Sequence, residues 1–135
     1  MTETRSRLLL LLWGGAVFVA VSTLRWGIVC SNPWTSLFAT SPVYAHYANY
    51  FPESLWGLFA ALAGLYQLCQ LHSYVSIHRL RLAISCLPIC ALHVFSSVCT
   101  FERTFISDAG YAFATAAIWE MALFAVLMLP PRKEL

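Results

Sequence analysis

Long apolar runs alternate with short polar stretches along the chain, and the runs lack the every-second-residue pattern of a half-buried strand. Four such runs are bounded by charged or polar residues, at about 8–24, 54–71, 82–101 and 105–129. Each holds about 17 to 25 residues, the length that an α-helix needs to cross the hydrocarbon core of a bilayer. Because backbone groups in lipid must be hydrogen-bonded within their own segment, we expect an all-α, integral membrane four-helix bundle.

The composition agrees with this interpretation. Of the 135 residues, 60% are hydrophobic and only 10% are charged, whereas a soluble domain carries about 25% charged residues. The net charge of +2 is too small to indicate nucleic acid as a partner. We therefore expect one transmembrane domain, residues 1–135, with the lipid bilayer as its surroundings and no soluble catalytic module, hence no enzyme.

The basic residues indicate an orientation for the four spans. Four spans place the N-terminus, the loop between the second and third spans and the C-terminus on one side of the membrane. Six of the eight basic residues lie there: Arg5, Arg7, Arg79, Arg81, Arg132 and Lys133. Arg25 and Arg103 fall on the other side. Since cytoplasmic loops carry the excess of Lys and Arg, both termini are predicted to be cytoplasmic.

The first apolar run has a second interpretation. Arg5 and Arg7 precede it, and Ala20-Val21-Ser22 fits a signal-peptide cleavage site. After cleavage the chain would keep three spans and begin outside, with the same distribution of charges. A retained first span is our expectation, because its aromatic spacing is typical of a span rather than of a leader.

The outer segment 25–53 is rich in aromatic residues, which favour the headgroup level of a membrane. Ser41 followed by Pro42 is typical of a helix start, and Pro52 would end the helix. Residues Val43, Tyr47, Tyr50 and Phe51 would then share one face. We expect a short interfacial helix that anchors the bundle, with a partner- or ligand-binding surface as the alternative.

Small residues recur at helical spacing in two of the spans. In lipid they let helix backbones approach closely. The second span carries Gly57, Ala60, Ala61 and Gly64, and the fourth carries Gly110, Ala112, Ala114 and Ala116. These faces are expected to pack on each other within one chain, or else to form an interface between copies or with other membrane proteins.

Glu120 is the acidic residue deep inside a span, where such residues face the bundle interior and find a partner. His93 lies at a similar predicted depth in the third span. A Glu120–His93 pair would be either a proton relay or a structural contact. A neutral, protonated Glu120 is a further alternative, because burial disfavours the charged form.

The cysteines suggest no cofactor. Cys86, Cys90 and His93 share one helix face, but one helix cannot close a tetrahedral metal site and the recognised zinc spacings are absent. Haem would require a second histidine at matched depth. Cys30 and Cys99 both fall near the outer surface, where an oxidising compartment would allow a disulfide between them.

One stretch resembles a family. Ser41-Pro42-Val43-Tyr44, then Pro52-Glu53-Ser54-Leu55-Trp56-Gly57, then Gly64-Leu65-Tyr66-Gln67-Leu68 resemble short four-span proteins encoded in phage and prophage genomes, whose second span opens with Pro-Glu-x-x-Trp-Gly. The resemblance implies a phage-like origin and a bacterial inner membrane, and it implies no specific activity.

Three hypotheses of function follow. The first is a non-enzymatic membrane protein that acts by assembly or by contact with envelope components, of which a holin-like pore former is one version. The second is an accessory subunit of a larger membrane complex. The third is a small proton-coupled transporter that uses Glu120 and His93.

Overall fold

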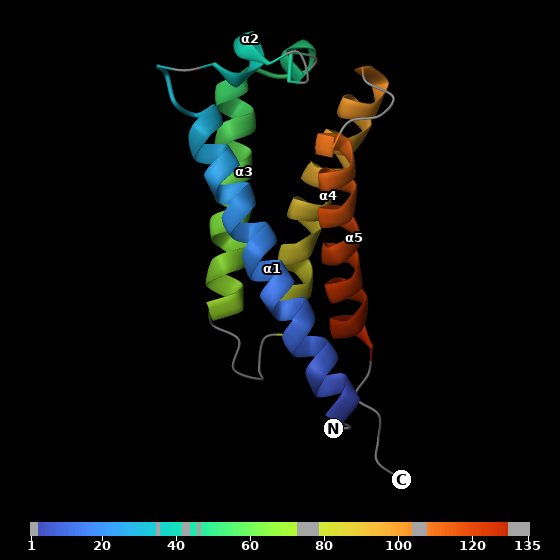
Figure 1. The fold of residues 1–135 in the computed structure, drawn as a ribbon. Coiled ribbons are helices and arrows are strands. Elements are labelled where there is room, and N and C mark those ends of the chain that lie inside the picture. Colours follow the sequence, from blue (N-terminus) through green and yellow to red (C-terminus); the bar gives the residue numbers. More distant parts are fainter. Residues whose placement is uncertain are drawn as a thin grey trace.

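A computed structural model of the chain describes residues 3–34, 36–41, 44–45, 47–72, 79–103 and 108–129, and every regular element among them is a helix (Figure 1). The elements in chain order are α1 (Glu3–Cys30), α2 (Leu37–Thr40), the 3₁₀ helix η1 (Tyr47–Asn49), α3 (Glu53–His72), α4 (Arg79–Arg103) and α5 (Asp108–Met128). This confirms the all-α fold class.

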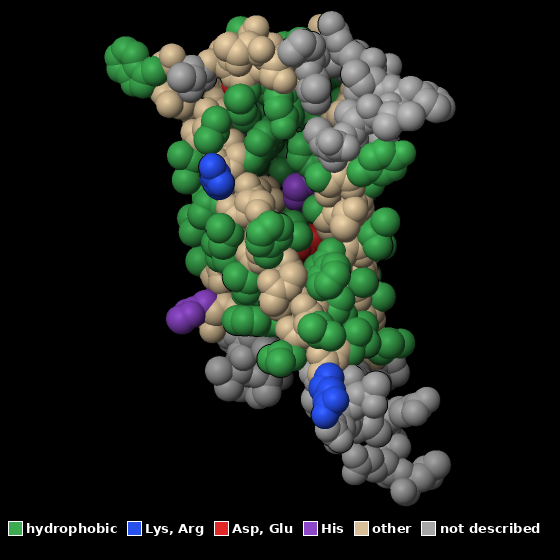
Figure 2. All heavy atoms as spheres, in the orientation of Figure 1, with side chains coloured by type: hydrophobic (Ala, Val, Ile, Leu, Met, Phe, Trp, Pro, Cys, Tyr) green, Lys and Arg blue, Asp and Glu red, His purple; other side chains and the backbone are tan. Residues whose placement is uncertain are grey.

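The first three predicted spans lie within α1, α3 and α4, and α5 covers residues 108–128 of the predicted fourth span, whose residues 105–107 lie outside the described residues. By length and composition, the segments that could cross a membrane are Arg7–Cys30, Glu53–His72, Arg79–Thr100 and Gly110–Met128. Large apolar side chains are exposed on these helices, and hydrophobic side chains dominate the visible face of their middle (Figure 2). Such a surface suits lipid rather than water, so the protein is an integral membrane protein.

The first span extends further than the charge pattern predicts. The predicted boundary at 24 rested on Arg25, but α1 continues through Arg25 to Cys30. Nothing between these residues breaks a helix, and a long basic side chain near a helix end can reach the membrane surface. Arg25 is indeed exposed.

The long helices run antiparallel, as two closely packed pairs, α1 with α3 and α4 with α5 (Figure 1). We call the end that carries α2 the α2 end, and the end where α1 begins and α5 ends the terminal end. Arg79, at the start of α4, donates to the carbonyl oxygens of Leu127 and Leu129 at 2.7 and 2.9 Å. This contact ties the start of α4 to the end of α5.

Glycines allow the close approach of α1 and α3. A Cβ atom on Gly27 would collide with the backbone of Gly57 and Ala61, and one on Gly64 would lie 2.8 Å from the carbonyl oxygen of Ala20. The small-residue face of the second span therefore packs on α1. The prediction that it packs on the fourth span is wrong, because α1 occupies this face at Gly57 and Gly64.

Of the small residues predicted to form a face on α5, Gly110 is buried against α4, whereas Ala112 is exposed. Gly110 and Ala117 are buried, and each presents its carbonyl oxygen to an α4 side chain, from Ser97 at 3.1 Å and from Cys90 at 3.7 Å. Ala114 is half-buried. Each small-residue face thus serves packing within one of the two pairs.

Two short helical segments lie between the first and second spans: η1 falls inside the predicted interval from Ser41 to Pro52, whereas α2 precedes it. Ser41 ends α2 instead of starting a helix, and Ser36 is the N-cap, accepting from the Ala39 amide at 3.0 Å. Pro42 and Val43 lie outside the described residues. The contact that positions α2 is distant in sequence, since Glu53 accepts from the Ser36 hydroxyl at 2.5 Å and from the Leu37 amide at 2.7 Å.

Aromatic rings close the α2 end of the bundle. We call this group the aromatic cap: Trp26, Phe38, Tyr44, Tyr47 and Trp56. Tyr47 is its fully buried centre, with ring centroids 5.6 Å from those of Phe38, Tyr44 and Trp56. The aromatic segment thus folds onto the bundle instead of lying only at its surface.

Candidate functional site

The buried face of α4 is polar along most of its length. Its buried polar and thiol side chains recur every three or four residues, so they share one face. We call this set the polar seam: Ser85, Cys86, Cys90, His93, Ser96, Ser97 and Thr100. Buried polar groups in a membrane helix are costly unless they are partnered, which makes the seam the candidate functional site.

Three helices meet at the carboxyl group of Glu120, in the terminal half of the bundle. Gln67 of α3 donates from Nε2 to Glu120 Oε2 at 2.5 Å, and it lies 3.7 Å from the Cys86 sulfur on α4. The Cys86 thiol donates to the carbonyl oxygen of Leu82, one turn earlier in α4, at 3.4 Å. All three side chains are fully buried, with none of their surface exposed. We call them the Glu120 cluster.

The Glu120 cluster is not fully satisfied. Glu120 Oε1 and Gln67 Oε1 are buried and have no hydrogen-bond partner in the described part of the chain. Nor does any basic side chain there pair with Glu120. Unsatisfied buried oxygens are rare and call for an explanation, so this cluster is the candidate functional centre of the bundle.

His93 has a different partner from the one predicted. Its Nε2 lies 2.9 Å from the hydroxyl oxygen of Thr23 on α1, and its ring stacks on Phe113 with centroids 5.7 Å apart. Its Nδ1 is buried and has no partner among the described residues. His93 therefore joins α1 to α4 rather than α4 to Glu120.

The predicted direct Glu120–His93 pair is wrong. Glu120 lies level with Cys86, which is seven residues before His93 and so about 10 Å away along the helix. Counting residues from the predicted membrane boundaries misplaced the two helices relative to each other. Cys90 lies between the two groups on the same face of α4.

The seam ends at the aromatic cap. The Tyr47 hydroxyl donates to the carbonyl oxygen of Ser96 at 2.8 Å and lies 3.2 Å from the Thr100 hydroxyl. Burial raises the pKa of Tyr47 to about 12, although its hydrogen bonds to Thr100 and Ser96 lower it. Tyr47 is thus uncharged, and its ring separates the polar seam from the membrane surface at the α2 end.

None of the five cysteines forms a disulfide, so the predicted Cys30–Cys99 bond is not formed. Both residues are buried in the cluster around the aromatic cap. Tyr47 lies between the two helices that carry them, since its ring packs on Trp26 of α1 and its hydroxyl bonds to Ser96 of α4. In the described ranges, no three His, Cys, Asp or Glu side chains are grouped to hold a metal ion.

Sequence reasoning missed Gln67 and Thr23, the two partners that complete the site. A signal for Gln67 was available, because it continues the stripe of Gly57, Ala60 and Gly64 at helical spacing and is an amide deep in a span. Thr23 likewise follows Ala16 and Ala20 on the buried face of α1. Polar residues in register with small ones face a neighbouring helix, and such residues are where intramembrane partners lie.

In comparisons with known proteins, no family model, no curated protein and no solved structure matches this chain. A proposal about function therefore has to be argued from the geometry of the polar seam and of the bundle surface.

Proposed function

We propose that the protein is a small non-enzymatic membrane protein that carries out proton-linked transport, with Glu120 as the proton-binding group. The observation that supports this most is the carboxyl group of Glu120, fully buried inside the bundle, without a basic partner and with one oxygen free. Intramembrane acidic residues of this kind mark ion and proton pathways.

The seam supplies polar groups between Glu120 and the α2 end. Toward the α2 end lie Cys90 and then His93, whose Nδ1 is unpartnered and whose Nε2 faces Thr23. Ser85, which is also buried, precedes Cys86 by one residue. One nitrogen of a neutral imidazole donates a hydrogen bond and the other accepts one, so the ring can continue a hydrogen-bonded path along this face. A proton or a proton-coupled solute would follow this face of α4.

The packing of the bundle supports alternating access. α1 with α3 and α4 with α5 form the extensive contacts, while the contacts between the two pairs are fewer. Rocking of one helix pair against the other is a common transport movement. In this chain such rocking would part Gln67 from Glu120 and uncover the carboxyl group. The enclosed seam favours a carrier over a wide, holin-like pore.

The proposal includes the predicted orientation, with both termini in the cytoplasm, and a bacterial inner membrane if the phage-like resemblance reflects its origin. Arg7 and Arg79, at the terminal end, support it through the positive-inside rule.

Proton uptake by the purified full chain tests the proposal. The protein is reconstituted into liposomes that contain a pH-sensitive dye, and a membrane potential is imposed. We expect acidification by the wild type and its loss in Glu120→Gln, whose amide keeps the shape and a hydrogen bond to Gln67. The control is Glu53→Gln, the same change at a carboxylate that lies at the α2 end and outside the polar seam. Equal proton flux through Glu120→Gln and wild type would contradict the proposal.

The second candidate is an assembly protein or accessory subunit that contacts other envelope components. It is favoured by Trp34, whose side chain is 90% exposed beyond the end of α1 at the α2 end. Exposed tryptophans are frequent binding anchors. A photo-crosslinking amino acid at position 34 should then give one defined protein adduct in cells, and the same label at lipid-facing Ile28 should not. If the Glu120→Gln variant keeps the cellular phenotype while Trp34→Ala loses it, this second function is the better one.

A further inference from the structure

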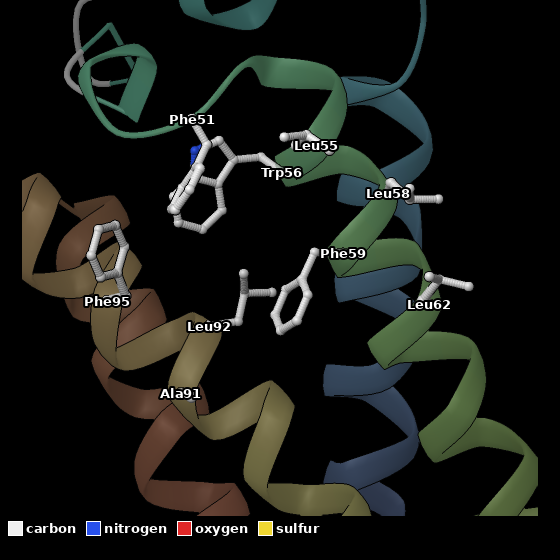
Figure 3. Close-up of a pocket in the computed structure, with 9 residues that line it drawn as sticks. All are labelled: Phe51, Leu55, Trp56, Leu58, Phe59, Leu62, Ala91, Leu92 and Phe95. Atoms are coloured by element: carbon white, nitrogen blue, oxygen red, sulfur yellow. The ribbon is translucent and has the colours of Figure 1, made fainter.

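A groove runs between α3 and α4 in the half of the bundle nearest the α2 end (Figure 3). Its volume is about 510 Å³, within the range of small-ligand pockets. Every residue that lines it is apolar: Phe51, Leu55, Trp56, Leu58, Phe59, Leu62, Ala91, Leu92 and Phe95. The polar seam, by contrast, contributes no lining residue.

The groove opens sideways, toward the membrane. Its rim on α3 consists of half-exposed side chains, with Leu55, Leu58 and Leu62 each more than 50% exposed. Its floor is buried, since Leu92 and Trp56 are only 3% and 7% exposed. Since both helices lie in predicted membrane spans there, hydrocarbon is the medium that borders the opening.

Aromatic side chains close the groove at the α2 end. Phe95 packs against Trp56 and Tyr50, with ring centroids 5.2 and 5.3 Å apart, and Phe51 packs on Trp56 at 5.9 Å. These rings separate the groove from the membrane surface. A water-soluble ligand therefore has no polar group to bind and no direct route from that end, whereas a lipid chain enters from the side.

We infer that this groove holds one acyl chain of a phospholipid from the leaflet at the α2 end. Its size argues against a helix from a second copy of the chain. A helix about 10 Å across and one leaflet, about 15 Å, long occupies more than about 1,000 Å³, so it does not fit in the groove. A single extended hydrocarbon chain is narrow enough, and it fills the groove without leaving a polar group unpaired.

Photo-crosslinking to lipid tests the inference on the full chain. The protein is reconstituted in phosphatidylcholine vesicles that contain a phospholipid with a diazirine on its acyl chain, and labelled residues are identified by peptide mass spectrometry. We expect adducts on buried Leu92 and Trp56 as well as on Ile118, which is 70% exposed. Leu123, which is 1% exposed in the core, should be labelled about tenfold less, because close packing leaves no room for lipid there.

A substitution that fills the groove gives the second arm. Ala91→Phe should reduce labelling of Leu92 and Trp56 by about tenfold, because the ring occupies the space of the chain. The matched control is Ala112→Phe, the same change at an exposed position of α5 that does not line the groove. It should leave the labelling of Leu92 unchanged.

Two results would overturn the inference. In the first, Leu92 and Trp56 of the wild type are labelled no more than Leu123. This comparison uses the wild type alone, so it does not depend on whether a variant folds. The other is a dimer, without a lipid adduct, when a photo-crosslinking amino acid is placed at position 92 in the same vesicles, which would identify a second copy as the occupant.

Discussion

Gln67 donates to Glu120 across two helices, α3 and α5, that are not among the extensively packed pairs of the bundle. The bond is therefore a direct polar link between the α1–α3 pair and the α4–α5 pair, made between fully buried side chains. Cys86 completes the link from α4. One carboxyl group thus has two roles, a structural one through Oε2 and the proposed proton-binding one through the unpartnered Oε1.

The structural role of this link predicts a non-additive pair of substitutions. Glu120→Leu leaves the buried Gln67 amide without its carboxylate acceptor, so the free energy of unfolding should fall by about 1–3 kcal/mol. Gln67→Leu should cost a similar amount, while the double variant removes both partners and should recover most of the loss. Thermal unfolding in detergent micelles, followed by circular dichroism, measures all three. Additive losses in the double variant would show that the two side chains act independently.

The hydrogen bond between Thr23 and His93 should contribute measurably to stability. Thr23→Val removes it, and the expected loss is about 0.6 kcal/mol, at most about 1.7, as for other hydrogen bonds between membrane helices. Thr115→Val is a matched control. Both hydroxyls bond to a carbonyl four residues earlier in their own helix, to Val19 and to Tyr111, each at 2.8 Å, but Thr115 is exposed. If both variants lose the same stability, the loss comes from the local bond and not from His93.

The spans were predictable because hydrophobic length is a local property that lipid imposes on each segment separately. The partners inside the bundle were not predictable. The depth of Glu120 relative to His93 depends on the offset of α4 and α5 along their axes, which neither helix sets alone. Likewise the start of α2 depends on Glu53, which contacts Ser36 from 17 residues away. The predicted end of the first span, at residue 24, is too early because it rests on Arg25 as the boundary. A charge near the membrane surface does not end a helix.

Glycine substitutions should separate close helix packing from helix propensity. In Gly64→Ala the new Cβ would lie 2.8 Å from the Ala20 carbonyl oxygen and from the Leu24 backbone nitrogen. The two helices must then move apart, at a cost of about 1–3 kcal/mol. Gly14→Ala is the control, because no atom lies within 4 Å of its added Cβ. That variant should be unchanged or more stable by up to about 1 kcal/mol, since alanine favours a helix.

Thermal unfolding in detergent micelles, followed by circular dichroism, gives the melting temperatures of both glycine variants. A lower melting temperature for Gly64→Ala and an unchanged or higher one for Gly14→Ala is expected. Equal melting temperatures would contradict the close α1–α3 contact at Gly64.

Tyr47 predicts a loss of stability at high pH. Burial raises its pKa from the ordinary value of 10.0 to about 12, so the folded protein binds the phenolic proton more tightly than the unfolded chain does. The stabilisation is therefore complete below pH 10 and is lost as the pH rises through about 12; it amounts to at most about 3 kcal/mol. Unfolding of wild type and Tyr47→Phe is compared across this interval.

The difference between these two proteins isolates Tyr47, because every other titrating group is common to both. Tyr44 is the necessary control, since burial also raises its pKa and it lies in the same aromatic cap. Tyr44 is only half-buried, so Tyr44→Phe should keep most of the pH dependence, whereas Tyr47→Phe should lose it. Near-ultraviolet absorbance of tyrosinate reports the ionisation directly. A wild-type curve that parallels that of Tyr47→Phe would mean that the hydroxyl is not held between Ser96 and Thr100, and the seam would then be open at the α2 end.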